Sequence, residues 1–313
     1  MKTYRMNGLG PCSAFVRRSI PALLLIPALA WTSEVLGAPI TFNTALPVPE
    51  GVFIAREQLI VNQSGDDPSG AGRDRTEVTA VSVLGYGLTG RWALFGVLPY
   101  RDIDLDVTSG AGRVTRRAEG FGDLRVFARY TAYRHDRPQR TTRVAPFFGV
   151  GAPTGEDTER DVLGVVPPAV QPGSGGWDVF GGVAATYQTL RYQVDGQVAF
   201  QANEEANGFE AGDLVRLDGS LQYRLYPKQF AGGVPGFLHG VIEVNLIHQG
   251  RNRINGITDP NSGGTRLFLT PGIQYIGQRW AVEGAVQVPV VQDLNGTALE
   301  NDYILRAGFR FLF

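Results

Sequence analysis

The carboxyl-terminal end of the chain alternates between apolar and polar positions. Counted back in twos from the last residue, one register is apolar throughout: Phe313, Phe311, Phe309, Ala307, Leu305 and Tyr303. The other register is largely polar and contains Arg310 and Arg306. A period of two is the signature of a β-strand with one apolar face and one wet face. A soluble sheet can produce the same pattern, so the rest of the chain must decide which environments the two faces meet.

Similar alternation recurs upstream and divides the chain from residue 51 onward into about twelve predicted strands. Their spans are 51–62, 74–87, 91–105, 120–134, 140–152, 176–189, 191–203, 212–226, 237–249, 264–276, 279–291 and 302–313. The connectors alternate in length: 87–90, 189–191 and 277–279 are short turns, 135–139 and 227–236 are looser members of the short class, and 62–73, 106–119, 153–175 and 249–263 are long and polar. Short periplasmic turns that alternate with long extracellular loops are typical of an outer-membrane barrel, whereas a sandwich or propeller has no reason to alternate.

These patterns predict an all-β fold, a transmembrane, antiparallel, up-and-down β-barrel of about 12 strands in the bacterial outer membrane. The aromatic last residue agrees, because such barrels commonly end this way, and Phe313 is then the signal read by the barrel-assembly machinery. Aromatic side chains also fall near strand ends in the outward register, as lipid-interface girdles require. They are Trp92, Tyr100, Tyr130, Trp177, Tyr187, Tyr192, Tyr223, Tyr275, Trp280 and Tyr303. Packing in the core of a soluble barrel is the alternative.

The amino-terminal end has the pattern of a secretory signal peptide. Basic residues precede an apolar run at 20–31, and small residues lead up to Pro39. We predict a leader at residues 1–38, cleaved after Ala38, and a single barrel domain at residues 39–313. A buried helix is the alternative, but two prolines interrupt the run. Cys12 is the only cysteine of the chain, so the mature protein would contain no disulfide and no thiol metal site.

Composition narrows the functional classes. The mean hydropathy is −0.07, with 29 basic and 30 acidic residues and a net charge of −1. Basic residues are not in excess, so the composition gives no indication of a nucleic-acid partner. A barrel has this profile because each strand gives half of its residues to the lumen.

Four short motifs, in order, resemble one known family. They are Tyr86-Gly87-Leu88-Thr89-Gly90-Arg91-Trp92, Gly120-Phe121-Gly122-Asp123-Leu124, Ala152-Pro153-Thr154-Gly155 and Gly173-Ser174-Gly175-Gly176-Trp177-Asp178. Together they resemble the family of outer-membrane transporters named for the meta-pathway of phenol degradation. The resemblance implies a barrel of about a dozen strands, a role in uptake of aromatic or other small compounds, and no catalytic residues. The connector from Pro153 is longer than the family pattern suggests.

The residues of each strand that face the lumen can be identified by placing charged side chains inside, because an Arg or Lys facing lipid costs about 2–4 kcal/mol at mid-membrane. The predicted lumen-lining charges are Arg125, Arg129, Arg143, Arg191, Arg216, Arg224, Glu243, Arg306 and Arg310. One interpretation is a polar channel that favours anionic or hydrogen-bonding solutes. The other is a network of ion pairs across the lumen that fills a narrow barrel.

The same parity places three aromatic residues on one wall of the lumen. Phe127, Phe147 and Phe180 share the register of inward charges on neighbouring strands. They would suit an amphipathic aromatic solute. Alternatively, a loop packs on the rings, and the apolar residues within 153–175 make that connector the candidate. Its length predicts that it is either functional or disordered.

No motif indicates catalysis. There is no nucleophile elbow, no Walker loop and no His/Cys metal spacing, so we expect no enzyme, no metal and no cofactor. The partners we expect are outer-membrane lipid, the assembly machinery and a small-molecule solute. The predicted function is a channel or transporter for passive uptake of small, aromatic or amphipathic solutes. The alternative is a non-transporting barrel, either a structural anchor or a protein that presents its loops for binding, and a barrel enzyme is the third and least favoured interpretation.

Overall fold

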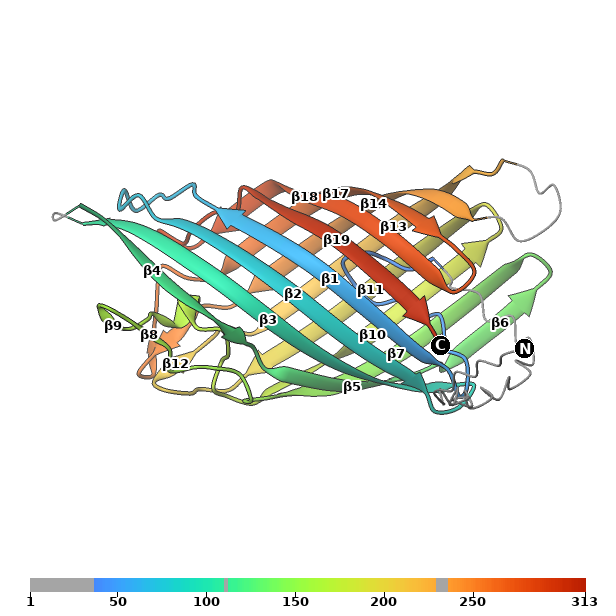
Figure 1. The fold of residues 1–313 in the computed structure, drawn as a ribbon, viewed down its shortest axis with the longest axis horizontal. Helices are drawn as coiled ribbons and strands as arrows, with labels where there is room; N and C mark the ends of the chain where they lie inside the picture. The colour runs from blue at the N-terminus through green and yellow to red at the C-terminus, as the bar shows by residue number, and fades with distance from the viewer. Residues whose placement is uncertain (1–36, 110–111, 229–235) are drawn as a thin grey trace, which may run out of the picture. The chain divides into compact units, whose positions relative to one another are not determined.

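The barrel forms as the alternation predicts. The computed structural model describes residues 37–109, 112–228 and 236–313, and these build a closed antiparallel barrel with twelve strands in its wall (Figure 1). Eleven wall strands are single segments: β1 (Phe53–Ser64), β2 (Asp74–Gly87), β3 (Trp92–Ser109), β7 (Arg140–Ala152), β10 (Asp178–Thr189), β11 (Tyr192–Asn203), β13 (Leu214–Tyr226), β14 (Phe237–Gln249), β17 (Gly264–Ile276), β18 (Trp280–Leu294) and β19 (Tyr303–Leu312). β19 pairs with β1 and closes the barrel. The fold class is therefore confirmed.

The remaining wall strand is broken into three pieces. They are β4 (Gly112–Phe121), β5 (Leu124–Tyr130) and β6 (Tyr133–Arg137). β4 pairs with β3, β5 pairs with both β3 and β7, and β6 pairs with β7 alone. The breaks fall at residues 122–123, after which the strand pairs with β7 as well as β3, and at residues 131–132, after which it leaves β3 and continues beside β7 alone.

The prediction of a long loop at 106–119 was wrong. β3 and β4 instead continue as a paired hairpin, from Tyr100 opposite Phe121 to Ser109 opposite Gly112. Opposite charges hold this extension together, because Arg113 lies 2.7 Å from Asp106 across the pair. Cross-strand charge pairs of this kind stabilise an antiparallel ladder. The charged composition that indicated a loop therefore belongs to a polar hairpin at the extracellular end.

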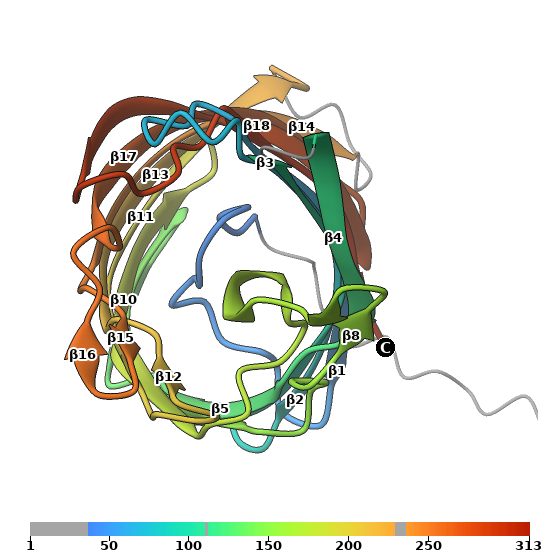
Figure 2. The same ribbon diagram turned by 90° about the vertical axis from the view of Figure 1, so that its left-hand side faces the viewer.

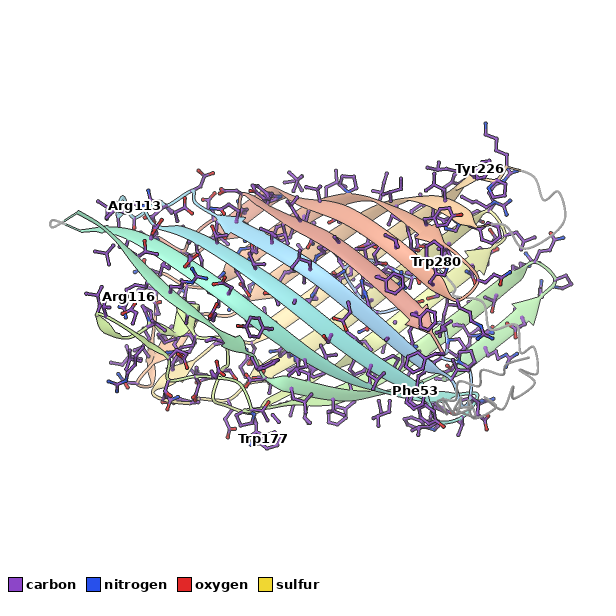
Figure 3. The ribbon with its side chains drawn as sticks, viewed as in Figure 1. Phe53, Arg113, Arg116, Trp177, Tyr226 and Trp280 are labelled. Atoms are coloured by element: carbon purple, nitrogen blue, oxygen red, sulfur yellow. The ribbon has the colours of Figure 1, made fainter. Side chains whose placement is uncertain are left out.

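The outer face of the wall is largely apolar, with aromatic residues near both ends. At the end with the short turns, ring centroids lie 4.7 Å apart for Trp92 and Tyr130, and 5.4 Å apart for Tyr275 and Trp280. Figure 3 shows Trp280 toward this end and Trp177 toward the other. No helix in the described ranges is long and apolar enough to cross a membrane.

The long connectors contain short elements of their own. These are β8 (Arg160–Asp161), β9 (Gly164–Val165), the 3₁₀ turn η1 (Pro168–Val170), β12 (Phe209–Glu210), β15 (Arg253–Ile254) and β16 (Ile257–Thr258). The connector 153–175 is ordered and folds into the mouth of the barrel (Figure 2). Of the two outcomes predicted for it, disorder is therefore wrong.

The predicted leader falls almost entirely on residues 1–36, which lie outside the described residues. Its last two positions, Gly37 and Ala38, are described and buried inside the barrel. Gln193 donates a hydrogen bond to the Gly37 carbonyl, and Gln274 and Arg310 donate to that of Ala38. The position of the cleavage site stays a prediction, which mass determination of the mature amino terminus would test. Cleavage after Ala38 would remove the contacts of Gly37 and Ala38 and leave residues 39–50 inside the barrel.

The last strand of the barrel is joined to the first where the barrel closes. Phe313 exchanges two backbone hydrogen bonds with Phe53, of 2.9 and 3.0 Å, and the two rings stack with centroids 5.6 Å apart. We predict that Phe313→Ser lowers outer-membrane accumulation several-fold, because it removes both the stacked ring and the terminal signal. Quantitative immunoblotting of outer-membrane fractions measures the effect. Phe200→Ser, which removes another exposed ring from the outer face, is the control. Equal loss in both variants would contradict a special role for Phe313.

Candidate functional site

A segment of the chain itself occupies the lumen. Residues 37–50, which we call the plug, precede β1 and run inside the barrel (Figure 2). Both ends of the plug lie at the end with the short turns, Gly37 beside Gln193 and Glu50 beside Gly87. Its middle reaches Glu243, halfway along β14. The plug therefore occupies part of the periplasmic half of the lumen.

Glu243 is the main anchor of the plug. Its side chain is completely buried, and Oε1 accepts a hydrogen bond of 2.7 Å from the backbone N–H of Ile40. Oε2 accepts a bond of 3.0 Å from the N–H of Thr41 and a further bond from the Thr41 hydroxyl. Hydrogen bonds to a carboxylate are about twice as strong as neutral ones. One inward charge of the wall thus fixes the middle of the plug.

Two arginines of the wall hold carbonyl groups of the plug. Arg129 donates to the carbonyl oxygens of Thr44 and Leu46, each at 2.7 Å. Arg310 donates to the Ala38 carbonyl at 3.2 Å and forms an ion pair of 2.5 Å with Glu283. Because the plug has no regular secondary structure, these side chains satisfy backbone groups that a helix or sheet would otherwise pair.

A cavity of about 430 Å³ lies directly above the plug, and we call it the chamber. Its floor is plug residues Ile40–Asn43, and its walls include these predicted residues: Arg125, Phe127, Phe147, Phe180, Arg216 and Arg306. A second cavity of about 450 Å³, the vestibule, lies toward the extracellular loops. The two cavities share Arg125 and Gln201 in their linings.

The phenylalanines form one cluster. The ring of Phe127 stacks on Phe95 at 4.7 Å and meets Phe147 and Phe180 edge-on at 6.2 and 6.0 Å. Val48 of the plug packs against this cluster. The aromatic wall is therefore partly covered from below, while Phe180 remains only partly buried.

The prediction that the connector 153–175 covers the phenylalanine rings was wrong. Residues within 153–175 do pack inside the mouth, but Val166 and Val170 contact Ile103, Leu105 and Ala118 on β3 and β4. The segment that covers the phenylalanines is the plug. The connector contacts the paired extension of β3 and β4 because that extension lies closer to the extracellular end than the ring cluster does.

The other predicted residues lie toward the periplasmic end. Arg143 is buried and forms an ion pair with Asp136. Arg224 lines a periplasmic cavity of about 370 Å³ beside Phe237. The placement of Arg191 on a lumen wall was wrong, because the residue lies in the short turn between β10 and β11 and is exposed.

Three of the family-like motifs meet at one carboxylate. Asp123, at the break between β4 and β5, accepts a 2.9 Å bond from the Gly155 N–H and a 2.7 Å bond from the Ser174 N–H. A Cβ on Gly155 would lie 2.7 Å from the carbonyl carbon of Gly122 and 2.8 Å from the Gly173 Cα, so only glycine fits. The two ends of the long connector are thereby latched to the wall.

A second contact pins the tip of this connector. Arg116 on β4 donates to the Asp161 carboxylate, and this hydrogen bond lowers the pKa of Asp161. In the described ranges, no group of three or more His, Cys, Asp or Glu side chains is placed to hold a metal ion.

The plug is the functional element that sequence reasoning missed. A signal was present, because Ile40, Phe42, Leu46 and Val48 are too apolar for a tail exposed to water, and all four are buried. The segment has no period of two, so a search for strands passed over it.

Comparison with known proteins agrees with this geometry. Residues 74–288 match the family described as "Putative MetA-pathway of phenol degradation". The chain belongs to this family. The match spans all four motifs, including the three that meet at Asp123. No curated protein matches the chain in sequence.

Solved structures show the fold of this member of the MetA family. The COG4313 outer membrane channel from Pseudomonas putida F1 is 14% identical, covers 90% of this chain and 100% of its own, and superposes with a TM-score of 0.66. The β-domain of the Bordetella autotransporter Brka is 15% identical, with coverages of 84% and 100% and a TM-score of 0.47. The translocator domain of NalP from Neisseria meningitidis is 14% identical, with coverages of 85% and 90% and a TM-score of 0.41. The protein is an outer-membrane β-barrel with a channel-type fold.

The plug contacts predict how the lumen opens. Glu243→Ala removes three hydrogen bonds to the plug, each worth about 1.5–3 kcal/mol because the acceptor is charged. We expect the plug to leave the lumen more often and the conductance in a planar bilayer to rise at least several-fold.

Arg113→Ala is the matched control, because Arg113 carries a charge of the extracellular hairpin and does not touch the plug. Unchanged conductance of a folded Glu243→Ala barrel would show that the plug does not limit permeation.

Proposed function

We propose that this protein is a passive channel for uptake of small amphipathic solutes, with aromatic compounds as the favoured class. The observation that carries the proposal is the pair of cavities above the plug, vestibule and chamber, which adjoin at shared lining residues. Both contain guanidinium groups and apolar side chains, and the vestibule also contains the carboxylates of Asp123, Asp157, Asp178 and Glu204. A solute with an apolar ring and a polar group finds partners for both along this route.

The contacts along the route are individually weak. Aromatic stacking and an Arg beside a ring contribute about 0.5–2 kcal/mol each. Arg125 lies with its guanidinium carbon 4.4 Å from the centroid of the Phe180 ring and so shows how a flat group can be held there. Weak, repeated contacts guide a solute without trapping it, which conduction requires.

The seated plug favours a second candidate, a non-transporting barrel. Its lumen would be a filled interior, and the exposed apolar tip Val162–Leu163 of the long connector would be a binding surface. Neither candidate uses a catalytic group. Transport measurements separate the two, because an anchor carries no solute whatever its lumen side chains are.

The aromatic wall gives the specific test. Phe127→Ala combined with Phe180→Ala should slow uptake of a small aromatic acid several-fold more than uptake of a sugar of similar size. Liposomes containing the refolded barrel and loaded with each solute provide the rates. Phe148→Ala is the matched control, because Phe148 neighbours Phe147 in sequence but is exposed on the outer face. Equal slowing of both solutes would assign the rings to structural filling, and no flux of either solute would favour the anchor.

A further inference from the structure

Three arginines converge on the chamber from evenly spaced positions around the barrel. Arg125 is on β5, Arg216 on β13 and Arg306 on β19. In the order of the wall, three strands separate each of them from the next. All three line the chamber, so a ring of guanidinium groups surrounds one small volume.

Two of these arginines are positioned by amides and not by carboxylates. Arg306 donates to the side-chain oxygens of Gln287 and Gln58, at 2.6 and 3.0 Å, and Arg125 donates to that of Gln201. Within the described residues, neither one has an acidic side chain within the 4.0 Å of an ion pair, whereas Arg216 lies 3.1 Å from Asp218. An amide oxygen fixes the direction of a guanidinium without neutralising it. Asp178 and Asp123 attract Arg125 from beyond ion-pair distance and offset its charge in part. Neither Arg125 nor Arg306 is held in a direct ion pair with a described residue, so both can still receive an anionic ligand.

Other lumen arginines show the contrast. Arg56 and Arg310 both contact Glu283 at 2.5 Å, which is the arrangement expected of charges that fill a lumen by pairing with one another. The two predicted roles of the inward arginines are thus divided between different residues. Pairing accounts for Arg56 and Arg310, but it does not account for Arg125 and Arg306.

Donor groups in the same cavity lack acceptors. The Nε atoms of Arg125 and Arg216 are buried and have no hydrogen-bond partner within the described protein. Arginine keeps its proton under all physiological conditions, so these N–H groups cannot be relieved by titration. A buried donor without an acceptor is costly. An anionic acceptor in the chamber would satisfy both charge and hydrogen bonding.

The space between the charges is apolar. Ile60, Val81 and Val97, from the three strands that separate Arg306 from Arg125, line the chamber wall. Phe127, two residues from Arg125 on the same strand, and Phe180, on β10 beyond it, add aromatic rings to the wall. A volume of about 430 Å³ is within the range of small-molecule sites, which combine apolar walls with a few placed polar groups.

We propose that the chamber is a binding site for amphipathic monocarboxylates, in which Arg125 and Arg306 receive the carboxylate and the aliphatic and aromatic walls receive its body. Guanidinium groups suit this ligand, because their planar N–H pairs match the two oxygens of a carboxylate. The site rests on the proposed function only for the route by which the ligand arrives. Neutral molecules of the same shape lack the group that the arginines recognise, and small anions without an apolar body leave the walls unused.

Equilibrium binding to the purified full-length barrel tests the site. Titration calorimetry in a zwitterionic detergent would compare benzoate with benzamide, which is its neutral isostere, and with acetate, which keeps only the carboxylate. We expect benzoate to bind at least about tenfold more tightly than either. Arg306→Gln should weaken benzoate about tenfold, equivalent to about 1.4 kcal/mol, and leave benzamide unchanged.

Further variants keep the test decisive. Arg125→Gln should reproduce the loss, and Arg113→Gln, on the extracellular hairpin, should not. Heat-dependent gel migration confirms that each variant is folded, and Arg306→Met, which also removes the charge, replaces Arg306→Gln if the latter fails to fold. Equal binding of benzoate and benzamide overturns the proposal, as does equal binding of benzoate and acetate.

The outcome is distinguishable from the fate of the channel proposal. If benzoate binds in an Arg306-dependent manner but the barrel passes no solute in liposomes, the proposed site is supported and the channel proposal is overturned. If solutes pass through the barrel but benzoate does not bind in an Arg306-dependent manner, the proposed site is overturned and the channel proposal stands.

Discussion

A membrane offers no hydrogen-bonding partners to a backbone, and this constraint governs the whole molecule. Every N–H and C=O of a spanning strand must pair with a neighbouring strand, so the sheet has to close on itself. Closure through β19 and β1 removes the free edges. It also assigns each residue of a strand to lipid or to lumen by parity alone. The apolar register goes outward, and most charges of the wall are directed into a confined interior. Glu57 on β1 is an exception, because it is exposed on the outer face and accepts a hydrogen bond from the Ser82 hydroxyl there.

That interior behaves as a polar core. Its charged side chains need partners, and the lumen is too narrow for each to be freely hydrated. Glu243 and Arg129 find theirs in the backbone of the plug, while Glu283 is paired with two arginines. A segment without secondary structure is well suited to this task, because its own amide groups are unpaired. The side chains of the wall and the backbone of the plug satisfy each other, and the space left above them is the chamber.

The strands of the barrel wall could be predicted from the sequence, whereas the segment and the contacts inside the lumen could not. Period-two alternation and short turns are local properties, so the strands appear within a few residues of their predicted spans. The hairpin at 106–119 was missed because its stabilising charges resemble those of a solvated loop. The plug has no period, and its partners are far away in the chain: Glu243 lies 203 residues from Ile40. Parity indicated which arginines face inward, but it could not show which would be left without a carboxylate.

The position of the plug has a consequence for the order of biogenesis. The plug lies at the amino-terminal end of the barrel domain and leaves the ribosome before any strand of the wall. Its partners are scattered over the whole length of the chain, from Arg129 on β5 through Glu243 on β14 to Arg310 on β19. These side chains surround a common space only after the last strand has joined the first. The earliest part of the domain to be synthesised is therefore the last to reach its final place, and a seated plug is a mark of a completed barrel.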